Sequence, residues 1–407
     1  MKLSRLLLFL FPLFCLSAAA QPDTSHLRIS LLTCSPGAEL YSTFGHTAIR
    51  VTDSARRIDM VYNYGTFDDS DPNFYAKFTR GIMVYALSRH PYQQFLAAYY
   101  EEKRSVIEQT LQLTGDQKQR LNAALKLNAL EKNRYYNYYF HTDNCTTRAR
   151  DMIVQKTGAS VVFNNILPEK RPTFRNLIHS YLDKAGQNWS KLGIDLLLGS
   201  NLDLQVTNEQ AMFLPDYLLN GFDNATADGH PLVAQKQAAL IVTPEPPSIT
   251  LFTPIFVFSA LFTIISLLSF STNIRARQFL NVFDSVFFLL VGFIGTLIIT
   301  LGAIRIDNVC QSNYNAIWAL PTHLPIAFVV YLKRKWLQYY FRSVFVLTIL
   351  FAVCWFFIPQ QINMAVLPVL GIIAMRSYFR GNLPVKKRAA SNTTNVFRSS
   401  KTINMEL

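Results

Sequence analysis

The sequence predicts an exported α+β domain followed by an all-α bundle of five transmembrane helices. Three observations lead to this prediction: a secretory signal at the start, mixed strand-like and helix-like patterns in the middle, and five apolar spans after a proline-rich linker. The chain has 407 residues, which is enough for two domains of ordinary size. The expected order is a signal peptide (1–20), an exported domain (21–242), a linker (243–250), a membrane domain (251–380) and a basic tail (381–407).

The N-terminal segment has the pattern of a cleaved secretory signal. Lys2 and Arg5 supply positive charge, residues 6–16 form an apolar stretch, and the small residues 18–20 provide a cleavage site. An uncleaved anchor is the alternative, but the small-residue pattern favours cleavage. Export then puts residues 21–242 outside the cytoplasm.

The exported part mixes strands with helices. Strand-like runs occur at 27–32, 47–51, 60–64 and 105–113, and a short helix is expected at 92–103. A longer helix at 117–131 follows Thr114 and Asp116, which are residues typical of a helix start. Residues 165–240 give weaker helical signals. A part of about 220 residues is large enough to bury its own core.

Five apolar spans follow the linker, in which three prolines exclude a helix or a central strand. The spans lie near 251–270, 282–304, 315–332, 343–358 and 363–379. The first two are long enough to cross a bilayer. The last three are short or are interrupted by prolines at 321, 325 and 368, so their limits are less well defined.

The net charge of +13 is unevenly distributed along the chain. Residues 21–250 hold 23 Lys+Arg and 23 Asp+Glu, whereas residues 273–407 hold 14 Lys+Arg and 3 Asp+Glu. The basic residues follow spans one, three and five, and the other loops are nearly neutral. This alternation predicts a bacterial inner-membrane protein whose Ser/Thr/Asn-rich tail is cytoplasmic and disordered. The basicity belongs to membrane-flanking segments, so nucleic acid is not an expected partner.

A thiol and an imidazole supply the candidate chemistry. Cys145 stands where a helix is expected to begin, and the helix N-terminus favours the nucleophilic thiolate. His46 stands at the start of a β-branched strand. A Cys and a His on separate elements are the minimum for covalent acyl transfer. The histidine comes first in the chain, which is the order of circularly permuted papain-like folds and the reverse of ordinary papain.

A third group should orient the imidazole. Asn63 and Tyr64, on the next expected strand, are the candidates, and packing within the strand is the alternative role for both. Asn144, which precedes the thiol, is a candidate helix cap and a candidate orienting or oxyanion residue.

Two arginines lie within about a turn of the thiol. Arg148 and Arg150 are candidates to bind a lipid phosphate or an acyl oxyanion, or they pair with Asp143 and Asp151. The exported domain also contains Cys34, so one structural disulfide with Cys145 is the alternative to a free nucleophile. No His/Cys cluster has the spacing of metal ligands, and we expect no metal and no cofactor.

Several segments together resemble the N-terminal periplasmic domain of the Bacteroidetes-type lipoprotein N-acyltransferases. The most specific are 44–51 and 143–151, accompanied by 32–37, 62–67, 72–75 and 78–81. The loop at 313–315 is similar to the polar inter-span loop of that family, although Cys310 stands where the family more often has histidine.

The resemblance implies a reaction in two steps. Cys145 would accept an acyl chain from a phospholipid, with His46 as the base, and form a thioester. The free α-amine of a lipid-modified N-terminal cysteine, on a diacylated lipoprotein, would then attack that thioester. The expected partners are therefore a phospholipid donor, a lipoprotein acceptor and the membrane.

Two other classes of function remain open from the residues alone. One is a papain-like thiol peptidase or amidase that acts on cell-wall peptide, although five spans exceed what such an enzyme needs. The other is a non-enzymatic, membrane-anchored export or folding factor in which Cys145 is structural.

Overall fold

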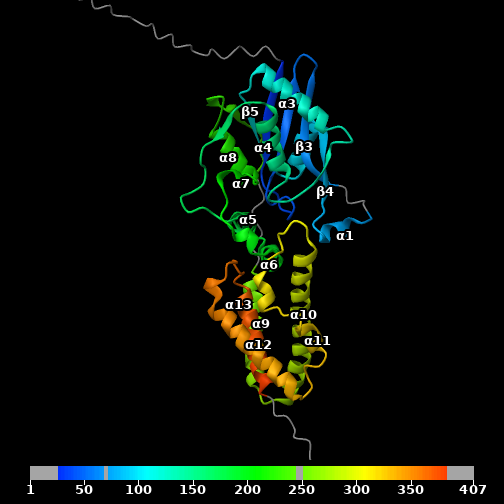
Figure 1. The fold of residues 1–407 in the computed structure, drawn as a ribbon, viewed down its shortest axis with the longest axis vertical. Coiled ribbons are helices and arrows are strands. Elements are labelled where there is room, and N and C mark those ends of the chain that lie inside the picture. The colour runs from blue at the N-terminus through cyan, green and yellow to red at the C-terminus, as the bar shows by residue number, and fades with distance from the viewer. Residues whose placement is uncertain (1–25, 68–71, 244–250, 383–407) are drawn as a thin grey trace, which may run out of the picture. The chain divides into compact units, whose positions relative to one another are not determined.

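The structure, a computed structural model, describes residues 26–67, 72–243 and 251–382 (Figure 1). It divides into two compact units. The first comprises the described residues up to Thr253 together with 300–313 and 359–361, and the second comprises 254–299, 314–358 and the described residues from Ile362. The expected signal peptide, the linker from residue 244 and the tail from residue 383 lie outside the described residues.

A seven-stranded antiparallel sheet forms the centre of the first unit, with the strand order β10-β5-β1-β2-β3-β4-β6. Its strands are β1 (Leu27–Cys34), β2 (His46–Asp53), β3 (Ile58–Phe67), β4 (Val84–Pro91), β5 (Val106–Leu111), β6 (Tyr135–Asn137) and β10 (Val233–Leu240). A small second sheet contains β7 (Val161–Phe163), β8 (Ala225–Ala227) and β9 (His230–Pro231).

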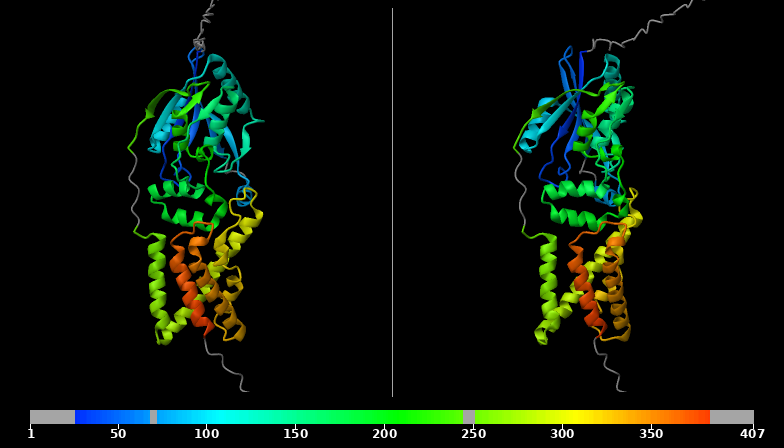
Figure 2. Two further views of the ribbon diagram at one scale, coloured as in Figure 1. Left: turned by 60° about the vertical axis from the view of Figure 1, so that its left-hand side comes forward. Right: turned by 90° about the vertical axis from the view of Figure 1, so that its left-hand side faces the viewer.

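Helices cover both faces of the large sheet (Figure 2). The helices α3 (Gly115–Asn128), α4 (Cys145–Lys156) and α8 (Pro215–Asp223) share one core with Ile49, Val51 and Tyr62. On the other face α2 (Tyr92–Glu101) packs against Leu32 and Ala48. Separate short helices build a further core: α5 (Phe174–Lys184), α6 (Asn188–Leu197) and α7 (Asn208–Ala211). The six-residue helix α1 (Phe74–Thr79) precedes β4.

The predicted strands and long helices of residues 27–131 are confirmed, with small shifts at their ends. The sequence did not indicate β4, α1, β6 or β10. Residues 165–240, which include β10, give weak helical signals in the sequence. The residues of β10 are mostly polar or alanine and have little strand propensity. It forms a strand because it pairs with the edge of the sheet along β5.

The second unit is helical, with α9 (Pro254–Phe270), most of α10 (Ile274–Ile304), α12 (Lys335–Val353) and α13 (Val366–Gly381). Within the described ranges, α10 and α12 are each long and apolar enough to cross a membrane. The expected span at 315–332 is not one continuous helix. It consists of a 3₁₀ turn (Tyr314–Ile317), the short helix α11 (His323–Ala327) and turns.

The interruption of this segment has two physical causes. Pro321 and Pro325 cannot continue a regular helix. The segment also lies directly on α10, where a Cβ added at Gly292 would be 2.3 Å from the Leu324 nitrogen and one at Gly295 would overlap the Ala319 oxygen. The contact is therefore backbone on backbone, which small residues allow in membrane proteins.

Candidate active site

The N-terminus of α4 is fixed by a complete capping box. The Asn144 side-chain oxygen accepts hydrogen bonds from the amides of Thr146 and Thr147, both at 2.9 Å. The Thr147 hydroxyl oxygen accepts in return from the Asn144 amide at 2.8 Å. Because this cap starts the helix, Cys145 becomes its first residue, near the positive end of the helix dipole.

His46 is the first residue of β2, and Asn63 of β3 holds its ring. The Nε2 atom of His46 and the Oδ1 atom of Asn63 are 2.5 Å apart, which assigns the donor role to Nε2. The other ring nitrogen remains for the Cys145 thiol, and the two side chains are within hydrogen-bonding reach. The structure thus brings the Cys145 thiol, the His46 imidazole and the Asn63 amide together in the order that a nucleophile, a base and an orienting group would need.

A bulge in β3 gives the site its shape. The pairing of β3 with β4 shifts register between Asn63 and Thr66, and Gly65 has a φ of +93°. A Cβ at Gly65 would be 3.4 Å from the Cys145 Cβ and 3.9 Å from the His46 Cε1. The bulge therefore presents bare backbone to the thiol, and such bulges often re-aim side chains at active sites.

The electrostatics favour an ion pair between thiolate and imidazolium. Burial alone would raise the pKa of Cys145, but the charge and hydrogen bond of His46, the Thr47 amide and the Thr146 hydroxyl lower it from 9.0 to about 7. Burial would likewise lower the pKa of His46, but the thiolate and the Asn63 hydrogen bond raise it. The nucleophilic form of Cys145 is thus available near neutral pH.

The second cysteine of the exported domain has a different environment. Cys34 pairs with His46 across β1 and β2, and both Cys34 and Cys145 are buried free thiols, so the alternative of a disulfide is not realised. Burial raises the pKa of Cys34 to about 12, which keeps it protonated. Tyr99 of α2 stacks on His46 from the same side, with ring centroids 6.5 Å apart.

The remaining candidate residues are occupied by other partners. Tyr64 donates its hydroxyl hydrogen to Asn128 at 2.6 Å, and the side-chain nitrogen of Asn144 donates to the carbonyls of Phe140 and Phe213. Asn144 is therefore a cap whose polar atoms are all used. Of the two candidates for orienting the imidazole, Asn63 is the one that contacts it.

Both arginines of α4 form the pairs that the sequence suggested as their simpler role. Arg148 makes a two-pronged contact with Asp143, at 2.6 and 2.7 Å, and lies over the ring of Tyr136. Arg150 bonds Asp151 at 2.7 Å and the Glu209 carbonyl at 2.8 Å. Neither geometry singles out an arginine as a phosphate ligand.

Comparison with known protein families identifies the family to which the chain belongs. One family model, described as the Lnb N-terminal periplasmic domain, matches residues 17–179, and another, described as the Lnb transmembrane domain, matches residues 246–388. The chain belongs to the Lnb family. It is therefore a membrane protein with a periplasmic N-terminal domain and a C-terminal transmembrane domain. No curated protein and no solved structure matches it.

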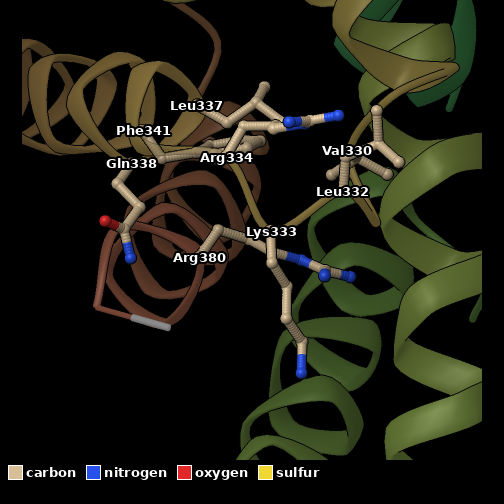
Figure 3. Close-up of a pocket in the computed structure, with 8 residues that line it drawn as sticks. All are labelled: Val330, Leu332, Lys333, Arg334, Leu337, Gln338, Phe341 and Arg380. Atoms are coloured by element: carbon tan, nitrogen blue, oxygen red, sulfur yellow. The ribbon is translucent and has the colours of Figure 1, made fainter. Parts of the chain in front are cut away.

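Three pockets of the described residues have linings that include neither Cys145 nor His46, and one of them, of about 910 Å³, lies at the ends of β1 and β2. A cleft of about 880 Å³ runs along α3 and α4 of the Lnb periplasmic domain, and its lining includes Tyr64 and Arg148 but neither member of the dyad. A pocket of about 10 Å³, room for roughly one water, is lined in the membrane domain by residues that include Lys333, Arg334 and Arg380 (Figure 3). None of these three pockets contains the reactive thiol.

The sequence did not identify Gly65 or Tyr138 as parts of the site. Tyr138 lies beside the same bare backbone, with its Cε2 atom 3.9 Å from the position that a Gly65 Cβ would take. Two features of the sequence could have pointed to them: the Tyr64–Gly65 pair within the run of β3, and the aromatic connector at 133–141 that contains Tyr138. Neither signal shows which residue would face the thiol.

Proposed function

We propose that this Lnb-family protein is a membrane-bound lipoprotein N-acyltransferase that uses Cys145 as the nucleophile. The observation that carries the proposal is the Cys145–His46–Asn63 arrangement, with its lowered thiol pKa, in a chain of this family. The order of strand-borne histidine and helix-capped cysteine supports a circularly permuted papain-like fold for the periplasmic domain.

In the first step, His46 takes the thiol proton and the Cys145 thiolate attacks the ester carbonyl carbon of a phospholipid. The carbon–oxygen bond to the glycerol breaks, and the His46 imidazolium gives its proton to the departing oxygen. The products are a lysophospholipid and a thioester on Cys145. The amides of Thr146 and Thr147 are held by the cap, so the Cys145 amide is the nearest backbone donor for the oxyanion.

In the second step, the neutral α-amine of a diacylated lipoprotein attacks the thioester carbonyl. The carbon–sulfur bond breaks, the amine loses a proton to His46, and the acyl chain ends as an amide on the lipoprotein. A lipid-facing, water-poor site would protect the thioester until the amine arrives. The membrane domain would concentrate both lipid-bound substrates on one surface.

Intact-mass analysis of the purified full-length protein with phospholipid vesicles tests the first step. We expect the mass to rise by one acyl group and to return to its starting value when a diacylated lipopeptide is added. The lipopeptide should gain the same acyl group. A protein that never carries an adduct, or a peptide substrate that is cleaved instead, would contradict the proposal in favour of the scaffold or the peptidase function.

Two cysteine variants provide the matched comparison. Cys145→Ser should form no adduct, because a serine hydroxyl ionises far above a thiol. Cys34→Ala should still form the adduct, because Cys34 is buried and protonated. His46→Ala should slow acylation about a hundredfold or more. Loss of both His46 and Cys145 should be no worse than loss of Cys145 alone, because the two act as one unit.

A further inference from the structure

A row of aromatic rings connects the thiol with the surface of the periplasmic domain. Tyr138 lies next to the dyad at Gly65. Its ring stacks on Tyr85 with centroids 4.3 Å apart and planes inclined by 22°, and Tyr85 in turn contacts Phe67 at 5.5 Å. Phe67 at the end of β3, the cross-strand partner of Tyr85, is 51% exposed. The row thus begins at the reactive sulfur and ends in the open.

The chemistry of this row suits a long, unbranched hydrocarbon chain. The flat faces of the three rings are apolar, and aromatic faces bury a large area at little conformational cost. A thioester on Cys145 has its acyl chain covalently attached at the inner end of the row. An acyl chain that lies along these rings would be stabilised because each methylene group that it buries is removed from water.

The helix α1, which precedes β4 in the chain, carries further exposed aromatic side chains. The chain runs from α1 directly into β4, and the Ile82 amide donates to the Lys77 carbonyl at 2.8 Å. Tyr75 is 82% exposed and Phe78 is 48% exposed. Large apolar side chains of a periplasmic domain with this exposure mark an interaction surface.

The polar segment after α10 is fastened to α1 within the same compact unit. The Ile306 amide donates to the Arg80 carbonyl at 3.1 Å, and the Arg305 guanidinium donates to the Phe78 carbonyl at 3.1 Å. A Cβ at Gly81 would lie 3.0 Å from the Asp307 carboxylate. Ile306 follows the end of α10 at Ile304 by two residues, and α10 is long enough to cross a bilayer, so these bonds join α1 to the segment that directly follows that helix.

We infer that Tyr138, Tyr85 and Phe67 form the binding surface for the donor acyl chain, and that α1 is the membrane contact through which the chain enters from the outer lipid surface. The inference rests on the proposed acyltransferase function and adds its lipid-binding site. Aromatic side chains at the membrane–water interface, accompanied by the basic Lys77 and Arg80, are typical of such a contact.

The inference predicts a dependence on chain length that can be measured at Cys145. The experiment compares adduct formation from vesicles of dipalmitoyl phosphatidylethanolamine with adduct formation from soluble dihexanoyl phosphatidylethanolamine. The readout is the ratio of the two acylation rates by intact mass. Because each buried methylene contributes about a fourfold preference, a polar substitution on the row should reduce this ratio about tenfold or more.

Three variants separate the parts of the path. Phe67→Ser and the double variant Tyr75→Ser/Phe78→Ser should each lower the long-to-short ratio, and all three side chains are exposed enough that folding is not threatened. Tyr100→Ser, which removes a 65% exposed ring from α2 on the other face of the sheet, should keep the parent ratio.

The outcomes distinguish this inference from the function on which it rests. An adduct in the parent protein with unchanged ratios in the path variants would overturn the acyl path and leave the acyltransferase function intact. An equal loss of acylation rate from the long-chain and the short-chain donor in the path variants would also overturn it, because the substitutions would then not affect binding of the acyl chain. Absence of any adduct in the parent protein would overturn both proposals.

Discussion

Two buried thiols, Cys145 and Cys34, lie near the same imidazole, yet their pKa values are shifted in opposite directions. Burial raises the pKa of both. Only Cys145 has a hydrogen bond and a charge partner in His46 together with bonds from the Thr47 amide and the Thr146 hydroxyl, and their combined effect exceeds that of burial. The difference in pKa between the two thiols therefore depends on the groups around each sulfur and not on depth in the core.

This difference predicts the pH dependence of alkylation. The thiolate is present above the pKa of the thiol, so labelling of Cys145 by iodoacetamide should increase as the pH rises through about 7. In His46→Ala the charge and hydrogen bond that lower the pKa of Cys145 are lost while burial remains, so this pKa should rise and labelling at pH 7 should fall about tenfold or more. Mass spectrometry of samples quenched across a pH series measures both profiles, and identical profiles would refute the ion pair.

Two tyrosines beside the site should respond differently to loss of their hydroxyl groups. Tyr64→Phe removes a bond to Asn128 and should destabilise the domain by about 1 kcal/mol. Tyr136→Phe should be neutral or stabilising, because its buried hydroxyl has no hydrogen-bond partner in the described part of the chain. Thermal unfolding in the same detergent ranks the variants, and a Tyr136→Phe protein that is less stable than Tyr64→Phe would contradict this assignment.

At the scale of secondary-structure elements, local signals in the sequence were sufficient where a cap or a clear alternation existed. Thr114 and Asn144 both form capping boxes, and the helices α3 and α4 begin directly after them. The strands β1 to β3 follow the strand-like runs that predicted them, and β5 follows an alternating pattern. Since His46 and Cys145 belong to elements with clear signals in the sequence, the two candidate residues could be proposed without the fold.

Other elements depend on contacts between distant parts of the chain. The edge strand β10 exists because it pairs with β5, more than a hundred residues earlier. The bulge at Gly65 depends on the register between β3 and β4, and β4 was not indicated by the sequence. The choice of Asn63 over Tyr64 follows from that geometry, because adjacent residues of a strand point to opposite faces.

The bulge can be tested by adding a single methyl group. Gly65→Ala introduces a Cβ in a left-handed conformation and against the dyad, so we expect lower stability and slower alkylation of Cys145. Gly229→Ala is the matched control, because its φ of +83° carries similar strain while no atom lies within 4 Å of the added Cβ. Alkylation rates at neutral pH and melting temperatures separate the two effects. Equal alkylation rates in both variants would show that Gly65 has no role at the thiol.

At the scale of the whole molecule, the polar segments between membrane helices have a larger role than their sequence suggests. Residues 300–313 and 359–361 belong to the periplasmic unit. The Gly199 amide donates to the Val309 carbonyl at 2.9 Å, and Gln360 donates to the Leu198 carbonyl at 3.1 Å. The sequence marked these segments only as nearly neutral loops, because the residues that bind them lie in the weakly patterned region 165–240.

The charges that predicted the orientation of the membrane domain are of two kinds in the structure. Arg376 and Arg380 are buried and both bind Asp284 of α10, so they connect α13 to α10. The predicted orientation then rests on the other basic residues that follow the first, third and fifth spans in the sequence, which are Arg275, Arg277, Lys333, Arg334, Lys335, Lys386, Lys387 and Arg388.

The broken segment between α10 and α12 decides on which side the C-terminus lies. If residues 314–332 cross the bilayer as an interrupted span packed on Gly292 and Gly295, an exported N-terminal domain is followed by five crossings and Leu407 is cytoplasmic. If they do not cross, only four crossings remain and Leu407 is periplasmic.

A fluorescent protein that matures only in the cytoplasm and a phosphatase active only in the periplasm, each fused after Leu407, distinguish the two arrangements. We expect fluorescence without phosphatase activity, since Lys333, Arg334 and Lys335 favour the cytoplasmic side. Phosphatase activity without fluorescence would show that the broken segment returns to the side from which it came.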